Sequence, residues 1–258
     1  MTEAELLAQL PVLAFQAALL FCRLGACGLL LPGLGEADVP AQIRLAMALA
    51  LVPLLLPVLG PALPPAPEGA AEAARLVATE VLIGLWIGWL ARLAALALGM
   101  AGQAVGFLIG LSSVLVQDPA LGGAGGPLSR LLGVAAAALT LGSGLYRLPL
   151  RALAESYALL PAGAAVPTGQ VAETLAGAIG GSLDLALRLA APFVLLSLLV
   201  QVAAGLVGRV APQTQAFVLV LPVQVAAGLG LLALLLPALL AHWLEAAEAL
   251  WQRLPGLG

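Results

Sequence analysis

The sequence predicts an all-α, polytopic membrane protein with about six or seven apolar segments in kinked hairpins. Hydrophobic residues make up 62% of the chain and charged residues only 9%, and the mean hydropathy is +1.12. A soluble domain has a more even balance. A helical span needs about 20 apolar residues, so the 258 residues of the chain leave room for several crossings with short connections. Prolines stand inside many of the apolar stretches, where each removes a backbone donor and favours a kink.

The charge balance argues against a nucleic-acid partner. The net charge is −3 and the isoelectric point is about 5.1. The ten basic residues are all arginine and are scattered along the chain, so the sequence predicts no basic surface.

The first two apolar segments cover residues 11–31 and 43–60. Arg23 lies near the middle of the first, where it either reaches the membrane interface along its stem or faces inward as a member of an ion pair. The second segment contains Pro53 and Pro57, which predict a bent helix.

Residues 75–116 form one apolar stretch, too long for one crossing, which we interpret as a helical hairpin or as one long helix with a break. Glu80, Gly84 and Gly88 follow at intervals of four, so they share one helix face. A carboxyl group at that depth needs a partner or a raised pKa, and Arg92 is too far along the same helix to be that partner. Further glycines have the small-residue spacing of closely packed helices: Gly99, Gly102, Gly106 and Gly110.

The stretch from residue 117 to 127 holds four glycines and two prolines, which disfavour a regular helix. Apolar segments follow at residues 128–145, 148–160, 171–207 and 218–240, and Pro192 predicts a kink in the third of these. Residues 242–253, with Trp243 and Trp251, read as a polar interfacial tail. Two pairs of opposite charges have i, i+4 spacing, so the members of each pair are expected to interact: Arg151 with Glu155, and Asp184 with Arg188.

Residues 205–228 combine a charge with two helix-breaking prolines. Pro212 and Pro222 are expected to break or kink a helix, so that segments 182–208 and 214–240 form a hairpin around Arg209. Arg209 either lies at the interface in a charged turn or faces protein, water or a partner.

Four separate matches in this chain resemble the FliR family, which supplies an export-gate subunit of the flagellar type III secretion system and has an injectisome counterpart. The C-terminal match consists of Arg209, Pro212, Gln213, Gln215, Phe217 and Pro222. In it, Gln215 and Val220 replace an asparagine and a glycine of the family pattern. The second match consists of Arg23, Pro32, Pro40 and Arg44, the third of Glu80, Gly84 and Gly88, and the fourth of Asp118 and Pro119 followed by glycine.

The resemblance implies one export-gate domain over residues 1–258, which is not an enzyme and holds no cofactor or metal. It implies assembly with FliP- and FliQ-type subunits into a closed channel for unfolded flagellar proteins, contact with the FlhB-type switch subunit, and a place in the bacterial inner membrane at the flagellar basal body. It also implies that residues 112–126 help to plug the channel: Ser112, Ser113, Gln117, Asp118, Pro119, Gly122 and Gly123.

Two other classes of function stay open at this point. Broken helices and the charges of Glu80, Arg92 and Arg209 also suit a secondary transporter of a small solute, although no convincing internal repeat is visible. Ser112 with the single histidine, His242, imitates an intramembrane serine protease, but so short a motif arises by chance in a chain rich in glycine and leucine.

Overall fold

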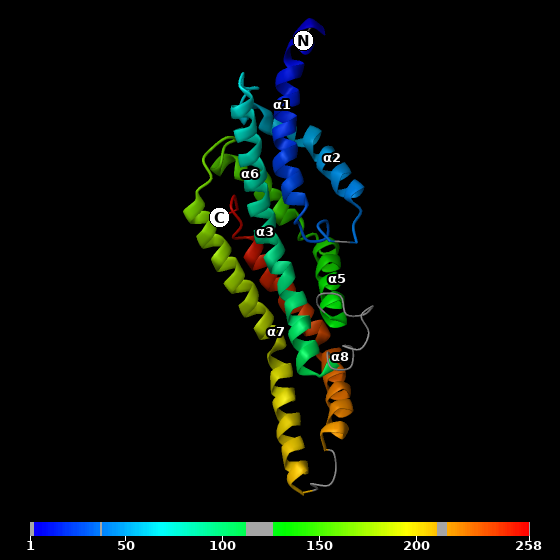
Figure 1. Cartoon of the computed structure of the whole chain (residues 1–258). Helices are drawn as coiled ribbons and strands as arrows, with labels where there is room; N and C mark the ends of the chain where they lie inside the picture. Colours follow the sequence, from blue (N-terminus) through cyan, green and yellow to red (C-terminus); the bar gives the residue numbers. More distant parts are fainter. Residues whose placement is uncertain (1–2, 37, 112–125, 211–215, 258) are drawn as a thin grey trace. The chain divides into compact units, whose positions relative to one another are not determined.

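The computed structural model describes residues 3–36, 38–111, 126–210 and 216–257, and this part of the chain is built of helices without a strand. The helices are α1 (Glu3–Gly28), α2 (Ala41–Leu59), the 3-10 turn η1 (Gly60–Ala62), α3 (Ala70–Leu108), α5 (Pro127–Gly142), α6 (Arg147–Leu159), α7 (Thr168–Val210) and α8 (Ala216–Trp251) (Figure 1). The predicted all-α class is confirmed.

The chain divides into two compact units. The first comprises Met1–Leu93, Thr140–Ala178 and Glu248–Gly258, and the second comprises Ala94–Leu139 and Ile179–Ala247. Three long helices, α3, α7 and α8, contribute residues to both units. The single export-gate domain remains a prediction.

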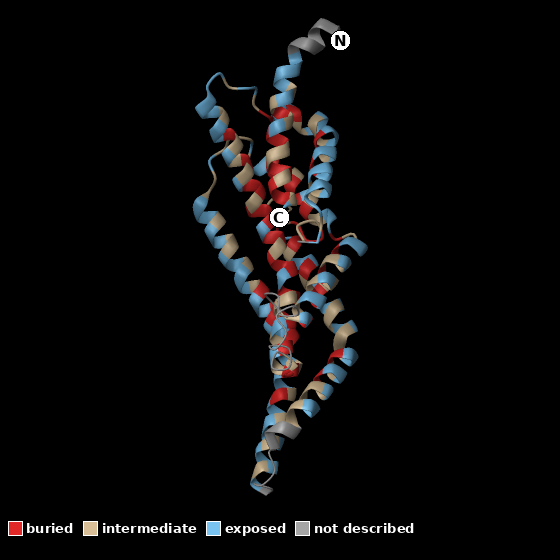
Figure 2. Ribbon diagram, turned by 45° about the vertical axis from the view of Figure 1, so that its right-hand side comes forward, coloured by how far each residue is buried: buried red, intermediate tan, exposed pale blue. Residues whose placement is uncertain are grey.

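In the first unit, α1 packs against α2, and the core forms where α1, α3 and α6 meet. Leu20, Ile83, Ile87 and Leu153 are almost completely buried there, as the red bands on these helices indicate (Figure 2). Burial of such side chains contributes about 1.5–3 kcal/mol each relative to leaving them in water.

In the second unit, α3, α5, α7 and α8 share an apolar cluster. Its buried members are Val105, Ile109, Leu128, Ala190, Phe193 and Leu232. Arg188 pairs with Asp184 at 2.7 Å on the exposed side of α7, as the spacing predicts.

Five of the described helices are long and apolar enough to cross a membrane, or up to six spans if the bent pair α5 and α6 counts as one. The angle between α5 and α6 is 68°. α3 is one continuous helix of 39 residues, so a hairpin turn between Ala70 and Leu108 is wrong and the expected break does not lie inside α3. Residues 112–116 of the predicted stretch lie outside the described residues. The prolines do not end their helices: Pro53 and Pro57 lie inside α2, Pro192 inside α7, and Pro222 inside α8.

The predicted polar tail is wrong. α8 continues to Trp251, and the side chains of Trp243 and Trp251 are both fully buried. The indole N–H of Trp251 donates to the carbonyl of Ala91 at 3.1 Å within the first unit, and that of Trp243 donates to the carbonyl of Ala94 at 3.0 Å within the second. These tryptophans therefore anchor the end of α8 in protein, because each buried indole finds a backbone acceptor.

Candidate functional site

A buried ion pair joins α1 to α3 in the first unit. Arg23 on α1 donates from Nε to Oε2 of Glu80 at 2.8 Å and from Nη2 to Oε1 at 2.9 Å. Both side chains are 0% exposed. The two parallel hydrogen bonds form the bidentate arrangement that the planar guanidinium favours. The inward-facing interpretation of Arg23 is thus confirmed, and Glu80 has its partner.

Helix α6 and its C-cap residue, Leu160, supply further contacts of the pair. Arg23 donates from Nη1 to the hydroxyl of Ser156 at 3.0 Å and from Nη2 to the carbonyl of Leu160 at 3.0 Å. Tyr157 donates its hydroxyl to Oε2 of Glu80 at 3.3 Å, and its ring lies 3.7 Å from the guanidinium carbon of Arg23. Arg23, Glu80, Ser156 and Tyr157 are called the charged node below.

The charged node holds three helices together rather than leaving a reactive group free. Both oxygens of Glu80 accept hydrogen bonds from Arg23, so the carboxylate lies directly against a guanidinium. Removing one partner of such a pair leaves an uncompensated buried charge, which costs about 3–5 kcal/mol.

Two glycines on the same face of α3 as Glu80 let α1 come close enough for this contact. A Cβ at Gly84 would overlap the carbonyl of Arg23, and a Cβ at Gly88 would lie 2.8 Å from the carbonyl of Cys27. The expected face of Glu80, Gly84 and Gly88 is therefore the surface that receives α1.

In the second unit, the four glycines predicted to pack closely do so unevenly. A Cβ at Gly102 would lie 2.7 Å from the carbonyl of Leu128, so α5 approaches there most tightly. Gly110 has a φ of +79°, a conformation that favours glycine. Around Gly99 and Gly106 a Cβ would meet only ordinary contacts at 3.7 and 3.8 Å.

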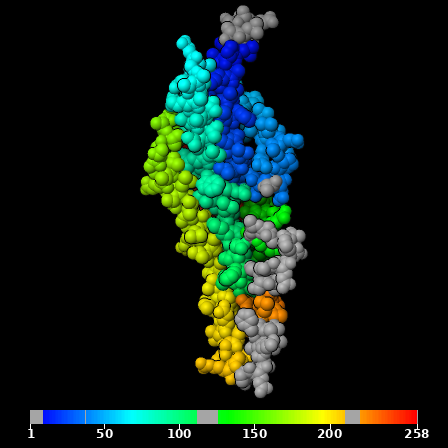
Figure 3. Space-filling model, viewed as in Figure 1, coloured from blue at the N-terminus to red at the C-terminus, as the bar shows by residue number. Residues whose placement is uncertain are grey.

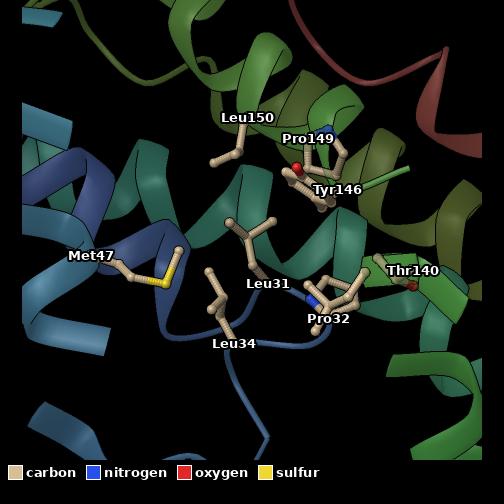
Figure 4. A pocket seen from close by; sticks show the side chains of 9 residues that line it. Leu31, Pro32, Leu34, Met47, Thr140, Tyr146, Pro149 and Leu150 are labelled. Carbon is tan, nitrogen blue, oxygen red and sulfur yellow. The ribbon is translucent and has the colours of Figure 1, made fainter. Parts of the chain in front are cut away.

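The turn between α1 and α2 is held by contacts within the first unit. Pro32 is buried and lines an apolar pocket of about 310 Å³ together with Met47 of α2, Tyr146 at the N-cap of α6 and Pro149 within α6 (Figure 4). Pro40 stands at the N-cap position of α2 without a side-chain cap, and Arg44 donates from Nη2 to the carbonyl of Val39 at 2.8 Å. The same turn is tied to α3 because Arg92 forms a bidentate pair with Glu36, with one of its two bonds measuring 3.0 Å.

The described residues of the C-terminal match lie on two helices, α7 and α8. Arg209 lies in the last turn of α7 with an exposed side chain, and Pro222 is exposed on α8. Phe217 belongs to the first turn of α8. Pro212, Gln213 and Gln215 lie outside the described residues, as do all seven residues of the expected plug.

Catalytic and metal chemistry find little support in the described ranges. His242 is exposed on α8, and the serines of the protease hypothesis fall outside these ranges. Within them, no group of three or more histidine, cysteine, aspartate or glutamate side chains is placed to hold a metal ion.

Sequence reasoning missed Ser156, Tyr157 and the pairing of Arg92 with Glu36. Residues 133 positions apart in sequence, such as Arg23 and Ser156, give no periodic signal of their contact. The available signal was electrostatic: a carboxyl group and two arginines inside apolar segments each require partners, and the turn between residues 32 and 40 offered an acid.

The chain is similar to known proteins over most of its length. Residues 14–250 match the family described as bacterial export proteins, family 1. The flagellar biosynthetic protein FliR of Caulobacter vibrioides is 34% identical over 235 residues, which cover 90% of this chain and 94% of that protein. FliR of Pectobacterium carotovorum is 33% identical over 166 residues (63% of this chain and 62% of that protein), and FliR of Escherichia coli K12 is 30% identical over 208 residues (80% and 78%). Since the family match runs through both units, and the first of these relatives is matched over nearly its whole length, the chain belongs to the FliR family of bacterial export proteins.

Proposed function

We propose that this chain assembles with FliP- and FliQ-type subunits in the bacterial inner membrane to form a closed helical channel for unfolded flagellar proteins. Membership of the FliR family makes the chain an export-gate subunit of a flagellar type III secretion apparatus. The match over residues 14–250 is the observation that carries the proposal. The proposed role is structural, without a catalytic step, and includes contact with the FlhB-type switch subunit.

The surface of α7 supports a role among partner helices. Five of its exposed apolar side chains follow one stripe with the spacing i, i+3, i+4, i+7 and i+11: Leu195, Leu198, Leu199, Val202 and Leu206. This part of α7 forms the yellow strip of surface in Figure 3. Such a stripe requires a cover of lipid or protein, because its exposure to water is unfavourable.

The length of the exposed surface favours protein over lipid for part of this cover. Exposed apolar side chains extend along α7 from Ile179 to Val207, about 42 Å at 1.5 Å per residue. The hydrocarbon core of a bilayer is only about 30 Å thick. Only 17% of the apolar window of α7 and 11% of that of α8 are buried, against 67% for α3. Partner subunits that cover α7 and α8 would shield from water the apolar surface that the bilayer core does not cover.

The charged node gives the proposed subunit a fixed frame. Because Arg23 and Glu80 are buried and fully bonded, α1, α3 and α6 of the first unit are held as one piece while other surfaces contact partners. In a solute transporter, by contrast, the same charges would have to open toward a substrate path.

The experiment that tests assembly is affinity purification of the tagged chain from its native cells in mild detergent, followed by mass spectrometry. Recovery of FliP- and FliQ-type proteins in one large complex is the expected result. A lone monomer or a homodimer would overturn the proposal and favour the transporter, for which solute uptake by Glu80 variants is then the relevant measurement.

Labelling with a lipid-soluble reagent should focus on α7 and α8. The chain itself already shields most of α3, so protection of residues 77–98 does not distinguish lipid from partners. Cysteines at Leu199 and Leu234, which are 69% and 76% exposed, should be protected in the assembled complex and labelled in the isolated chain. If these cysteines were labelled to the same extent in the assembled complex and in the isolated chain, partner contact at these surfaces would be contradicted.

We also propose that residues 112–126 help to close the channel. Shortening the glycine-rich part, residues 122–126, should raise the leak of small solutes through the assembled gate, because less of the chain fills the pore. A deletion of equal length in the loop at residues 64–68 serves as a control. Unchanged leak would count against the plug.

A further inference from the structure

An apolar groove lies between α1 and α2 in the first unit, with a cavity volume of about 340 Å³. Phe21, Gly25 and Leu29 line it from α1, and Leu45 and Ala48 line it from α2. α1 and α2 run side by side in opposite directions (Figure 1), so Leu29 and the start of α2 lie at one end of the groove and Phe21 and Ala48 at the other. The volume lies in the range of pockets that bind small molecules.

One cation lines this apolar groove. Arg44 donates from Nη2 to the carbonyl of Val39, but its buried Nε has no hydrogen-bond partner among the described residues. A buried donor without a partner is unfavourable, so an acceptor at this position would stabilise the site. Of the acids in the preceding turn, Glu36 is already paired with Arg92.

The start of α2 adds to the positive potential at the same end of the groove. Pro40 at the N-cap has no side chain that accepts from the first backbone N–H groups, and the first turn of α2 contains no acidic residue. Ala41, at that turn, lines the groove with Arg44. The uncapped N-terminus of a helix attracts negative charge, which adds to the charge of Arg44.

We propose that this groove binds an anionic phospholipid, whose phosphate lies against Arg44 and whose acyl chain follows the apolar lining toward Phe21. Arg44 is the fourth residue of the apolar span that begins at Ala41, so it stands near the end of the span, at the depth of lipid headgroups. Basic pockets between spanning helices bind anionic headgroups in this way. A free phosphate ion uses only the charged end, whereas a phospholipid uses the charge and the apolar lining together.

The test uses the full chain purified in mild detergent and supplied with phosphatidylglycerol or with phosphatidylcholine of the same acyl chains. Retained lipid is counted by native mass spectrometry. The chain should retain phosphatidylglycerol in preference, and Arg44→Gln should lower that preference about tenfold, as expected for the loss of one charge-assisted contact. Arg147→Gln removes an equal charge from an exposed position of α6 outside the groove and should leave the preference unchanged.

Two further variants separate the charge from the fold of the turn. Arg44→Lys loses the planar contacts of the guanidinium but keeps the charge, so it should retain most of the preference. Gly25→Leu should lower the retention of both lipids with Arg44 intact, because a side chain there points into the groove and its Cβ meets Phe21 only at an ordinary 3.8 Å.

The proposal is independent of the export partners, so its failure leaves the proposed function standing. Equal retention of the two lipids, or an equal effect of Arg44→Gln and Arg147→Gln, would overturn it. Inorganic phosphate that raises the thermal stability of the chain as much as phosphatidylglycerol would point to a plain anion site. Crosslinking of Leu45 to a partner subunit in the assembled complex, without lipid, would assign the groove to protein.

Discussion

At the scale of single residues, the first unit depends on a buried pair of opposite charges, Arg23 and Glu80, whose side chains are both fully buried. The position of Glu80 in an apolar helix requires a partner, and Arg23 in another apolar segment is one of the few cations available. Their pairing over 57 residues was not derivable, because the chain offers other arginines and the pattern along each helix says nothing of the neighbouring helix. Ser156 and Tyr157 carried still less signal, because polar residues in a short segment suit an exposed surface equally well.

The first prediction concerns the pair itself. Glu80→Gln removes the charge that compensates Arg23 and should lower the free energy of unfolding by about 3–5 kcal/mol. A double variant, Arg23→Leu with Glu80→Leu, should recover much of this loss, because it leaves no buried charge. The measurement is thermal unfolding of the detergent-purified chain. Arg151→Gln, in a pair whose arginine is 69% exposed, is the control and should change stability by less than about 1 kcal/mol. A double variant less stable than Glu80→Gln would contradict this account.

The second prediction separates the two contacts of Tyr157. Tyr157→Phe keeps the ring 3.7 Å from the guanidinium carbon and loses only the 3.3 Å hydrogen bond, so it should cost no more than about 1 kcal/mol. Tyr157→Leu loses both contacts and should cost clearly more. If both variants lowered the free energy of unfolding equally in the same measurement, the contact of the ring face with the guanidinium would contribute nothing to stability.

At the scale of elements, periodicity and composition predicted most helices and misassigned the end of the last one. Segments at residues 128–145 and 148–160 correspond to α5 and α6, and residues 171–207 to α7. The prediction of an interfacial tail was wrong because tryptophans near acidic residues are typical of a membrane interface. In this chain the rings of Trp243 and Trp251 lie in the protein interior instead. The sequence did not decide whether α3 is continuous, because its glycines are compatible both with a break in the helix and with the close approach of a neighbouring helix. Only the position of α1 against α3 distinguishes the two.

The third prediction tests this close approach. Gly84→Ala should destabilise the chain by about 1–3 kcal/mol, because the added Cβ overlaps the backbone carbonyl of Arg23, which moves only with α1. Gly177→Ala is the matched control inside α7, where nothing lies within 4 Å of the added Cβ. It should be neutral or stabilising by up to about 1 kcal/mol, the difference in helix propensity. Equal effects of the two substitutions in thermal unfolding would refute the packing role of Gly84.

At the scale of the whole molecule, the chain has more apolar surface than its own core consumes. Leu195, Leu199 and Leu234 are each more than 60% exposed, although the chain also contains fully buried clusters. The sequence predicted the class and, through resemblance, the family. It did not predict which helices are shielded by the chain itself, because a hydrophobic helix has the same composition whether it faces lipid, a partner or its own core.

The last prediction places a charge on this surface. Leu199→Glu adds a carboxylate to the apolar stripe of α7, where a partner helix would have to desolvate it. Recovery of FliP- and FliQ-type proteins with the tagged chain should therefore fall at least about tenfold. The isolated chain should unfold at an unchanged temperature, since this side chain is 69% exposed and supports no core contact. Ala172→Glu puts the same group at an exposed position in the first turns of α7, next to Glu173, and should leave recovery unchanged. A different result would assign the stripe to lipid: the Leu199→Glu variant still recovers its partners, but less of the variant chain is found in the membrane. The assembly surface must then lie elsewhere on the molecule.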